Sequence, residues 1–495
     1  MRTFWVGIGL ICSFTASCSF TASVPAASLG REAIEITPGQ DLQAAVEQAP
    51  EGADFVLRAG VYRQQMVRPK ARQRFIGDGE VVLSGAIVLT AWTRQGPYWT
   101  AIALPAPLPA HGECASDRPL CTAREDLFVD EKPYRRVSSL AEVGPGTWLY
   151  RDGKAFLADD PGGRIVELGV TPHAFYGDAD GVVLKNLVVE KYASPGQRGA
   201  IDIDGGRDWR ILDVTARLNH ALGLQMDTGA SVVGGSFVHN GQMGIGGIGS
   251  DLSVERAVIA FNNYAGFDPA WEAGGAKFAE TDRLVVRQTC VHNNDGPGLW
   301  TDIDSINTVY ERNVIFGNAY EGIRHEISFG GTIAENFVMM NGASSPGWLW
   351  GSQILLQNSR SNVVRNNFVV VAAEFGNGIG IVHQDRGGGP FGSRDGVDNT
   401  ILRNKIIHLG EHGLSGLDSD VEPRVDQPNS FRSNIYTGIA RDGRYWLFDG
   451  QALTWPGVRR IGQDTNGKFI VGRATIPASS CSDSLRQLGF GDQPK

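Results

Sequence analysis

Asparagine recurs along the middle of this 495-residue chain at a nearly regular interval, which limits the fold more than any other feature. The positions are Asn219, Asn240, Asn262, Asn293, Asn318 and Asn341, with successive steps of 21, 22, 31, 25 and 23 residues. Asparagine tolerates the left-handed backbone of a tight turn, and stacked asparagine side chains can hydrogen-bond from coil to coil. A period of this length is typical of a repeat architecture in which each unit contacts only its neighbours.

Short β-rich segments flank the asparagines, and no stretch between residues 181 and 419 carries a helical period. The segments include 210–212, 231–233, 284–286, 308–310, 332–334, 362–364 and 400–402. Three short strands per period fit a right-handed parallel β-helix, whereas the Leu-x-x-Leu-x-Leu line of a leucine-rich repeat is absent. The sequence therefore predicts an all-β fold, a right-handed parallel β-helix (solenoid) with its core over residues 171–420.

The flanking regions carry other patterns. Residues 34–89 are expected to form an N-terminal cap and the first coils, with an amphipathic capping helix over 41–49 that covers the open end of the core. Residues 90–170 interrupt the repeat with strand and turn signals, which predicts a small β insertion built from hairpins. Residues 421–495 are expected to close the C-terminal end.

The first residues are typical of an export signal. An apolar run over residues 4–12 follows Arg2 and is too short to span a membrane. We expect a signal peptide over residues 1–26, and a lipobox-like Thr-Ala-Ser-Cys leaves open a lipid anchor on Cys18. The protein is then secreted or periplasmic, or anchored to the bacterial envelope, and meets a membrane only through that anchor.

Cysteine usage and charge narrow the class further. In an oxidising compartment Cys114 and Cys121 are expected to form a disulfide and Cys290 to be a buried thiol, whereas Cys481 has no assignment. No cysteine and histidine spacing matches a zinc site. The net charge is -9 and no basic tract occurs, so nucleic acid is not an expected partner. We expect the protein to be a monomer.

Two similar lines of sequence lie 24 residues apart and concentrate the candidate chemistry. They are residues 298–304, Gly-Leu-Trp-Thr-Asp-Ile-Asp, and residues 322–328, Gly-Ile-Arg-His-Glu-Ile-Ser. Their alternation predicts strands on neighbouring coils. The side chains expected to face outward are Trp300, Asp302, Asp304, Arg324, Glu326 and Ser328, and those expected to face inward are Leu299, Thr301, Ile303, Ile323, His325 and Ile327.

The strongest candidate for chemistry is a pair of carboxylates. Aligning the two lines on their glycines puts Asp302 beside Glu326, and two like charges on adjacent strands raise at least one pKa. One protonated and one ionised carboxyl are what glycosidic bond cleavage needs. Asp304, farther along the strand, and Lys277, on the preceding coil, are the other catalytic candidates. The structural alternative is a solvated acidic ladder that Arg324 and Lys277 compensate.

Further residues are candidates for holding a sugar. An exposed indole at Trp300 would offer a flat apolar face on which a sugar ring stacks, with Arg324 beside it. The remaining substrate-binding candidates are Glu272, Asp227, His325 and Gln384. Alternation places His325 on the inward side of its strand, where a histidine usually has a structural role.

The asparagine turns, the N-terminal cap and the two lines resemble the pectate-lyase-like right-handed β-helix superfamily, and more narrowly a bacterial group of secreted right-handed β-helix repeat proteins. The resemblance covers residues 34–420 and implies a polysaccharide or oligosaccharide substrate. The fold hosts lyases, hydrolases, epimerases and adhesins. We expect a glycoside hydrolase that needs no cofactor. Two alternatives stay open: a polysaccharide lyase with Lys277 or Arg324 as base and Ca²⁺ on Asp302 and Asp304, and a non-catalytic carbohydrate-binding or adhesin array.

Overall fold

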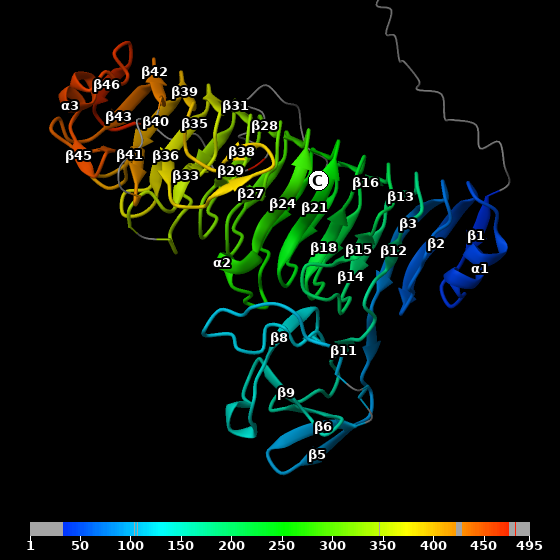
Figure 1. Ribbon diagram of the computed structural model, residues 1–495. Helices are drawn as coiled ribbons and strands as arrows, with labels where there is room; N and C mark the ends of the chain where they lie inside the picture. Colours follow the sequence, from blue (N-terminus) through cyan, green and yellow to red (C-terminus); the bar gives the residue numbers. More distant parts are fainter. Residues whose placement is uncertain are drawn as a thin grey trace, which may run out of the picture.

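The computed structural model describes residues 33–474, except 103, 106, 346 and 422–427, together with Cys481. Its main body is a parallel β-helix whose coils stack along one axis, and a smaller β unit projects from one side (Figure 1). The predicted all-β solenoid with a β insertion is therefore confirmed. The predicted signal peptide and lipobox lie outside the described residues. No helix in the described ranges is long and apolar enough to cross a membrane.

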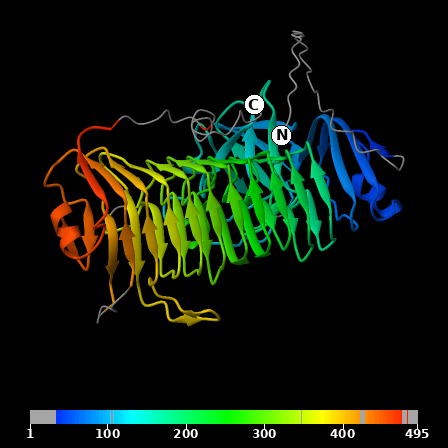
Figure 2. The same cartoon turned by 90° about the horizontal axis from the view of Figure 1, so that it is seen from above.

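Each coil contributes one short strand to each of three faces. One face is a separate 12-stranded sheet, and the long strands β2 and β3 join the other two into one sheet of 24 strands. Figure 2 views the stack from above, and successive strands lie side by side from one end of the molecule to the other. The 12-stranded sheet consists of β12 (Phe175–Gly177), β15 (Gly199–Ile203), β18 (Leu222–Met226), β21 (Met243–Ser250), β24 (Gly274–Asp282), β27 (Leu299–Asp302), β30 (Ile323–Glu326), β33 (Ser352–Gln357), β36 (Asn377–His383), β41 (Ser415–Ser419), β44 (Trp446–Phe448) and β45 (Gln451–Leu453).

The 24-stranded sheet covers the remaining two faces. The first holds β1 (Ile34–Ile36), β2 (Asp54–Arg63), β3 (Arg74–Ser84), β13 (Val183–Lys185), β16 (Arg210–Leu212), β19 (Ser231–Val233), β22 (Ser253–Glu255), β25 (Val285–Arg287), β28 (Val309–Glu311), β31 (Thr332–Ala334), β34 (Val363–Arg365), β39 (Thr400–Leu402) and β42 (Ser430–Arg432). The second continues from β2 and β3 through β14 (Val188–Glu190), β17 (Thr215–Arg217), β20 (Ser236–Val238), β23 (Val258–Ala260), β26 (Cys290–His292), β29 (Val314–Phe316), β32 (Phe337–Met339), β35 (Phe368–Val371), β40 (Lys405–His408), β43 (Ile435–Gly438) and β46 (Lys468–Val471).

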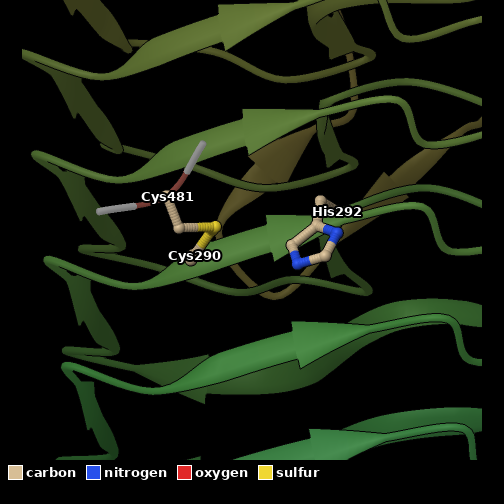
Figure 3. Close-up of side chains that lie close together, drawn as sticks. All are labelled: Cys290, His292 and Cys481. Carbon is tan, nitrogen blue, oxygen red and sulfur yellow. A yellow bond between two sulfur atoms is a disulfide. The ribbon is translucent and has the colours of Figure 1, made fainter. Parts of the chain in front are cut away.

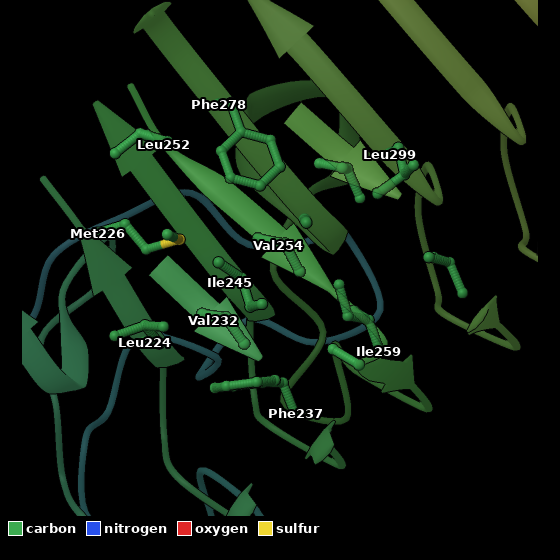
Figure 4. Packing of buried hydrophobic residues seen from close by; sticks show 14 of the residues in the cluster. Leu224, Met226, Val232, Phe237, Ile245, Leu252, Val254, Ile259, Phe278 and Leu299 are labelled. Atoms are coloured by element: carbon green, nitrogen blue, oxygen red, sulfur yellow. The ribbon is translucent and has the colours of Figure 1, made fainter. Parts of the chain in front are cut away.

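The interior is filled by the apolar side chains that alternate inward along these strands. Figure 4 shows side chains from successive coils, among them Leu224, Ile245 and Phe278, packed into one continuous core. These three side chains are fully buried. Because burying one such side chain stabilises a fold by about 1.5–3 kcal/mol, the stack of coils is held mainly by this core.

A ladder of buried asparagines fixes the register of the coils. Nδ2 of Asn219 donates to Oδ1 of Asn240 at 3.0 Å, and Asn240 donates to Asn262 at 3.1 Å. The ladder continues through Asn294, Asn318 and Asn341. A second ladder, which the sequence did not predict, runs through Asn313, Asn336, Asn367, Asn404 and Asn434.

Two features of the predicted ladder differ in the structure: one of its asparagines, and the residue that has the left-handed backbone. Asn294, not Asn293, takes part, and the left-handed residue is the one before each ladder asparagine. These residues are Leu218, His239, Phe261 and Asn293, with φ of 56°, 52°, 57° and 53°. A left-handed non-glycine residue costs about 1–2 kcal/mol. The turn accepts this cost because it brings the next asparagine side chain into the ladder, where each hydrogen bond stabilises by about 1 kcal/mol.

Short helices cover both ends of the described core. Asp41 caps α1 (Leu42–Gln48) through a hydrogen bond from the backbone N–H of Ala44 at 3.0 Å, and Val46 of α1 is buried against the first coil. At the opposite end α3 (Trp455–Arg460) buries Val458 in the same core. The third α-helix of the described chain, α2 (Pro269–Glu272), is a single turn that lies beside the candidate site.

The insertion forms its own sheet with its own core around Trp148. Its strands are β4 (Ala86–Val88), β5 (Trp92–Gln95), β6 (Tyr98–Ile102), β7 (Leu127–Val129), β8 (Lys132–Arg136), β9 (Thr147–Arg151), β10 (Lys154–Leu157) and β11 (Val166–Gly169), with a 3₁₀ turn over Leu140–Glu142. The predicted disulfide between Cys114 and Cys121 is confirmed. Cys114 also pairs with Phe267, just before α2, so the disulfide loop docks on the β-helix (Figure 1).

Candidate active site

The candidate site lies on the outer face of the 12-stranded sheet. The register pairs Lys277 with Trp300 between β24 and β27, and Trp300 with Arg324 between β27 and β30. Three successive strands therefore carry a column of large outward side chains. This register agrees with the alignment of the two sequence lines on their glycines, and it also pairs Thr301 with His325 on the inward side.

The indole of Trp300 lies between two cations. Nζ of Lys277 is 4.0 Å and Cζ of Arg324 is 4.8 Å from the ring centroid. Only 3% of Trp300 is exposed, so the expectation of an exposed indole is wrong. The physical reason is that a cation–π contact in a desolvated site stabilises by about 2 kcal/mol, and both neighbours in the column supply one.

Lys277 is held between two carboxylates. Its Nζ lies 3.0 Å from Oδ2 of Asp302 and 3.1 Å from Oε2 of Glu272. Burial opposes the charged form of Lys277, but Glu272 and Asp302 outweigh it and raise the pKa of this amine overall. Lys277 is thus a fixed positive charge that compensates Asp302.

Asp302 and Glu326 end neighbouring strands, one residue beyond the paired positions Thr301 and His325. Both carboxyls are buried to more than nine-tenths. Burial, together with the negative charge of Asp302, raises the pKa of Glu326. The two groups have different surroundings, because the lysine ion pair belongs to Asp302.

Glu326 has two described donors of its own. Trp300 Nε1 donates to Oε2 of Glu326 at 3.2 Å, and Arg386 Nη1 donates to Oε1 at 2.8 Å. Arg386 and Arg324 lower the pKa of Glu326, but less than burial and Asp302 raise it. The carboxyl is therefore oriented by hydrogen bonds at both oxygens, and its pKa is raised overall.

Arg324 is committed to a carboxylate that the sequence did not single out. Nε of Arg324 donates to Oε2 of Glu321 at 3.0 Å, and Oε1 of Glu321 accepts from the backbone N–H of Gly351 at 2.8 Å. Burial opposes the charge of Arg324, but Glu321 and Glu326 raise its pKa overall. Glu321 stands just before a predicted strand, and nothing in the sequence indicates that its side chain bonds to Arg324 three residues later.

Asp304 does not extend the strand as expected. β27 ends at Asp302, and Ile303 and Asp304 both have left-handed backbones, with φ of 47° and 55°. The chain therefore turns, Ile303 is exposed instead of inward, and Oδ1 of Asp304 accepts from Nε of Arg394 at 3.0 Å. Alternation fails here because it holds only while the strand lasts.

A glycine-rich hairpin supplies the two arginines that the sequence interpretation missed as site residues. It contains β37 (Gly388–Gly389) and β38 (Gly392–Ser393), and Arg386 and Arg394 flank these strands. The hairpin projects from the edge of the stack in Figure 2. Two arginines around a run of glycines were the available signal, but their targets, Glu326 and Asp304, are 60 and 90 residues away in the chain.

Glu272 connects the site to the insertion. It ends α2, whose N-cap is Asp268, and its Oε2 accepts from Nε2 of Gln197 at 3.0 Å as well as from Lys277. Oε1 of Gln197 in turn lies 3.0 Å from Nε2 of His111 in the insertion. Glu272, predicted as a substrate-binding candidate, therefore lies beside Lys277 and is held there also from the insertion through Gln197 and His111.

Three further candidates lie outside this cluster. His325 is inward, as alternation predicted: its Nδ1 lies 3.0 Å from Oγ1 of Thr301, and burial lowers its pKa to about 4. Asp227 closes a turn by accepting from the backbone N–H groups of Gly205 and Thr228. Gln384 bonds to the side chains of Gln357 and Asp420 on its neighbouring coils.

One group of metal-ligand type occurs in the described residues, away from the carboxylates. Figure 3 shows Cys290, His292 and Cys481 together, with their candidate ligand atoms within 4.8 Å of one another. Cys290 and Cys481 are joined in a disulfide, so the prediction of a buried thiol at Cys290 is wrong and Cys481 gains its partner. The sequence separation of 191 residues gave no local signal for this pairing. A disulfide offers no thiolate to a metal.

The comparisons with known proteins agree with this architecture. The sequence model for the right-handed beta helix region matches residues 199–369, so the predicted right-handed parallel β-helix is confirmed. No curated protein matches the sequence.

Among solved structures, the complex of XylC with xylose is similar, with a TM-score of 0.64, 15% identity and coverage of 83% of each chain. The A-module of the mannuronan C-5 epimerase AlgE4 from Azotobacter vinelandii has a TM-score of 0.48 and 13% identity, over 82% of this chain and 94% of that one. A structure described as a glycoside hydrolase has a TM-score of 0.37 and 11% identity, over 93% and 99%. The likeness to the XylC structure supports the β-helix fold.

Proposed function

We propose that the protein is a glycoside hydrolase in which Glu326 is the general acid and Asp302 is the ionised carboxylate. The observation that carries the proposal is the contrast within this pair. Glu326 is buried beside a like charge that raises its pKa, whereas Asp302 is ion-paired with Lys277. Glycosidic bond cleavage needs one carboxyl that gives a proton to the leaving oxygen and one that remains negative.

The strand register favours a retaining mechanism. Neighbouring strands lie about 4.8 Å apart, which is closer to the spacing of about 5–5.5 Å in retaining enzymes than to about 6.5–9.5 Å in inverting ones. In the first step Asp302 bonds to the anomeric carbon while Glu326 protonates the departing oxygen. In the second step the Glu326 carboxylate takes a proton from water, the water oxygen bonds to the anomeric carbon, and Asp302 leaves.

The neighbouring cations suit this division of labour. Lys277 stabilises the negative form of Asp302, because protonating Asp302 would break an ion pair in a buried site. Trp300 and Arg386 orient the two oxygens of Glu326. Arg324 supports the site by its contact with Trp300. Asp304 and Glu326 bind Arg394 and Arg386, and these two ion pairs hold the hairpin beside the carboxylates.

A lyase mechanism is less well supported, because its base must be unprotonated. Lys277 and Arg324 are both ion-paired, and the pKa of each is raised. A calcium site on Asp302 and Asp304 is also disfavoured, because these carboxylates already bond to Lys277 and Arg394. The lyase remains as an outcome of the test below.

The substrate and the compartment are part of the proposal. The XylC structure contains xylose, so xylose-containing oligosaccharides are the first substrates to test. Two disulfides, one within the insertion and one over a separation of 191 residues, suit an oxidising compartment. We therefore propose that the protein acts on oligosaccharides or polysaccharides after export.

The decisive experiment identifies the products from a panel of neutral and uronate-containing glycans. A retaining hydrolase gives reducing ends whose initial anomeric configuration in the proton NMR spectrum matches that of the bond cleaved, and Asp302→Asn loses this activity. Inversion of the anomer would reject Asp302 as the nucleophile. A product with a new double bond that absorbs in the ultraviolet, or full activity in both Asp302→Asn and Glu326→Gln, would reject the hydrolase.

A further inference from the structure

A second concave site lies where the insertion meets the β-helix, and it shares no residue with the carboxylate pair. The cavity has a volume of about 370 Å³, which falls in the range of about 300–1,000 Å³ of small-molecule sites. The insertion lines it with the segments 117–123 and 133–138, and the β-helix lines it with Tyr264 and Ala265. Such junctions between structural units are frequent places for ligands.

The floor of this junction pocket carries a fixed acceptor. Oδ2 of Asp126 accepts from the hydroxyl of Tyr264 at 2.7 Å and lies 3.0 Å from Nδ1 of His220. Burial and Asp126 raise the pKa of Tyr264 well above its ordinary value, so its hydroxyl stays protonated and donates. Oδ1 of Asp126 has no hydrogen bond from any residue in the described ranges and is available to a ligand hydroxyl.

The pocket lining also contains two neighbouring arginines, and only one of them has a fixed side chain. Nη1 of Arg136 lies 3.0 Å from Oε2 of Glu125, and its guanidinium carbon lies 5.2 Å from the ring centroid of Trp148 and 5.3 Å from that of Tyr150. Arg136 is therefore fixed. Arg135, the next residue toward the N-terminus, is exposed and forms no side-chain ion pair within the described chain.

The pocket is preorganised by covalent and buried contacts. The Cys114–Cys121 disulfide closes the loop that forms one wall. Just after this loop Arg124 donates to the carbonyl of Ala193 through Nε at 2.9 Å and Nη2 at 2.7 Å. A wall held at both ends loses little conformational entropy when a ligand binds.

We propose that the junction pocket binds one pyranose unit that carries a carboxylate. Planar carboxylate and guanidinium groups can each bond two neighbouring hydroxyls, and the rings of Tyr134 and Tyr264 offer faces to the apolar side of a sugar. Of the three carboxylates in the lining, Glu142 accepts from Ser138 and Ser139, Asp126 accepts from Tyr264, and Asp117 lies 3.5 Å from Nε of Arg118. The charge of Arg135 is left for the ligand carboxylate.

This site takes no part in the bond cleavage proposed above, so binding is measured without turnover. Saturation-transfer NMR and calorimetry on the full-length Glu326→Gln protein would use D-glucuronate, with D-glucose as its neutral counterpart. We expect glucuronate to bind more tightly than glucose. Arg135→Ala should weaken glucuronate binding about tenfold, because a charge-assisted hydrogen bond is lost. Tyr264→Phe should weaken the binding of both sugars, because the hydroxyl that holds Asp126 is lost while the ring remains.

Arg151→Ala is the matched control, because Arg151 is an exposed arginine of the same insertion that is absent from the pocket lining, and its side chain pairs with the adjacent Asp152. Unchanged thermal unfolding of each variant shows that the insertion is intact. The proposal is overturned if glucuronate shows no saturation transfer, or if Arg135→Ala and Arg151→Ala bind it equally well. If the unmutated protein cleaves no glycan of the panel and Glu326→Gln still binds glucuronate, the proposed hydrolase alone is rejected.

Discussion

The asparagine ladder and the outward column of Lys277, Trp300 and Arg324 belong to the same coils but follow opposite rules. In the ladder one residue type repeats. Each inner member accepts from the asparagine of the preceding coil and donates to the asparagine of the next coil. In the column every member is different, and some of its contacts come from segments outside the repeating strands. Lys277 relies on Glu272, and Glu326 beside the column relies on Arg386 from the hairpin.

The difference separates what the repeat needs for folding from what it can carry as chemistry. A self-complementary ladder can be extended by any number of coils, because each coil satisfies the next. The column instead brings two carboxyls together, and like charges on adjacent strands weaken a sheet. An arrangement that costs stability while the rest of the solenoid gains it is typical of a functional site.

The largest expected effect comes from Glu326→Gln. Losing the general acid should lower glycosidase activity by about 10²–10⁴-fold. The free energy of unfolding should rise by up to about 1 kcal/mol, because the charge repulsion with Asp302 is removed. Because the pKa of Glu326 is raised when folded, its ionisation opposes folding as pH rises above 4.5, and Gln removes this pH dependence. Urea unfolding at several pH values and initial rates measure both effects.

Gln is nearly isosteric with Glu, and its single amide oxygen keeps an acceptor for one of the two donors, Trp300 or Arg386. A variant that loses activity and stability together would break the comparison, since Glu326 would then belong with the ladder as a structural group.

The second prediction addresses the ladder. The Asn318 side chain donates to Val291 and Asn341 and accepts twice from Asn294, so Asn318→Ala leaves buried polar groups without partners. We expect a loss of about 2–4 kcal/mol in the free energy of unfolding, with activity per folded molecule unchanged. Chemical denaturation and active-site titration separate these two quantities.

Asn307→Gly is the control, because Asn307 is exposed, its side chain donates to Asp282, and glycine accepts its left-handed φ of 58°; this change should cost less than about 0.5 kcal/mol. Equal losses at the two positions would mean that the ladder contributes nothing beyond ordinary surface hydrogen bonds.

The ladder also shows how far the sequence could predict the fold. The interval of recurrence sufficed for the architecture, because repetition averages over errors at single positions. It failed at Asn293, where two adjacent asparagines differ only in backbone conformation. It also missed the second ladder, which begins at Asn313, because the interval alone did not distinguish two series of asparagines in the same coils.

The site was predictable only where the strand register determines it. The alignment of two glycines brought Asp302 and Glu326 together, since parallel strands in a solenoid keep their register over neighbouring coils. The partners Arg386, Glu321 and Cys481 arrive from loops or distant segments, and no local pattern encodes which side chain a loop will meet. Burial of Trp300 was missed for the same reason, because alternation predicts direction but not what covers the surface.

Lys277→Met is expected to have an intermediate effect. Methionine keeps the length of the side chain and its packing on Trp300, but the positive charge between Asp302 and Glu272 is lost. Asp302 should then protonate at higher pH, so activity should fall about 10–100-fold at acidic pH and recover partly as pH rises. Measuring kcat/KM against pH tests this, and Lys277→Arg should restore most of the activity.

A uniform loss at every pH in Lys277→Met, without rescue by Arg, would show that Lys277 supports packing alone. The column would then resemble the ladder in role, and the distinction between the two regions would weaken.

The smallest expected effect is a shift in the pH profile of Arg386→Gln. Arg386 lowers the pKa of Glu326, so its loss should raise that pKa further, and the alkaline limb of kcat/KM should move to higher pH by about half a unit. The shift is modest because 36% of the Arg386 side chain is exposed and solvent screens its charge. Arg394→Gln removes the other arginine of the hairpin, which pairs with Asp304 instead of Glu326, and should leave the limb in place. If both variants moved the limb equally, the hairpin would act as a whole by covering the site, and the separate assignment of Arg386 to the acid would be wrong.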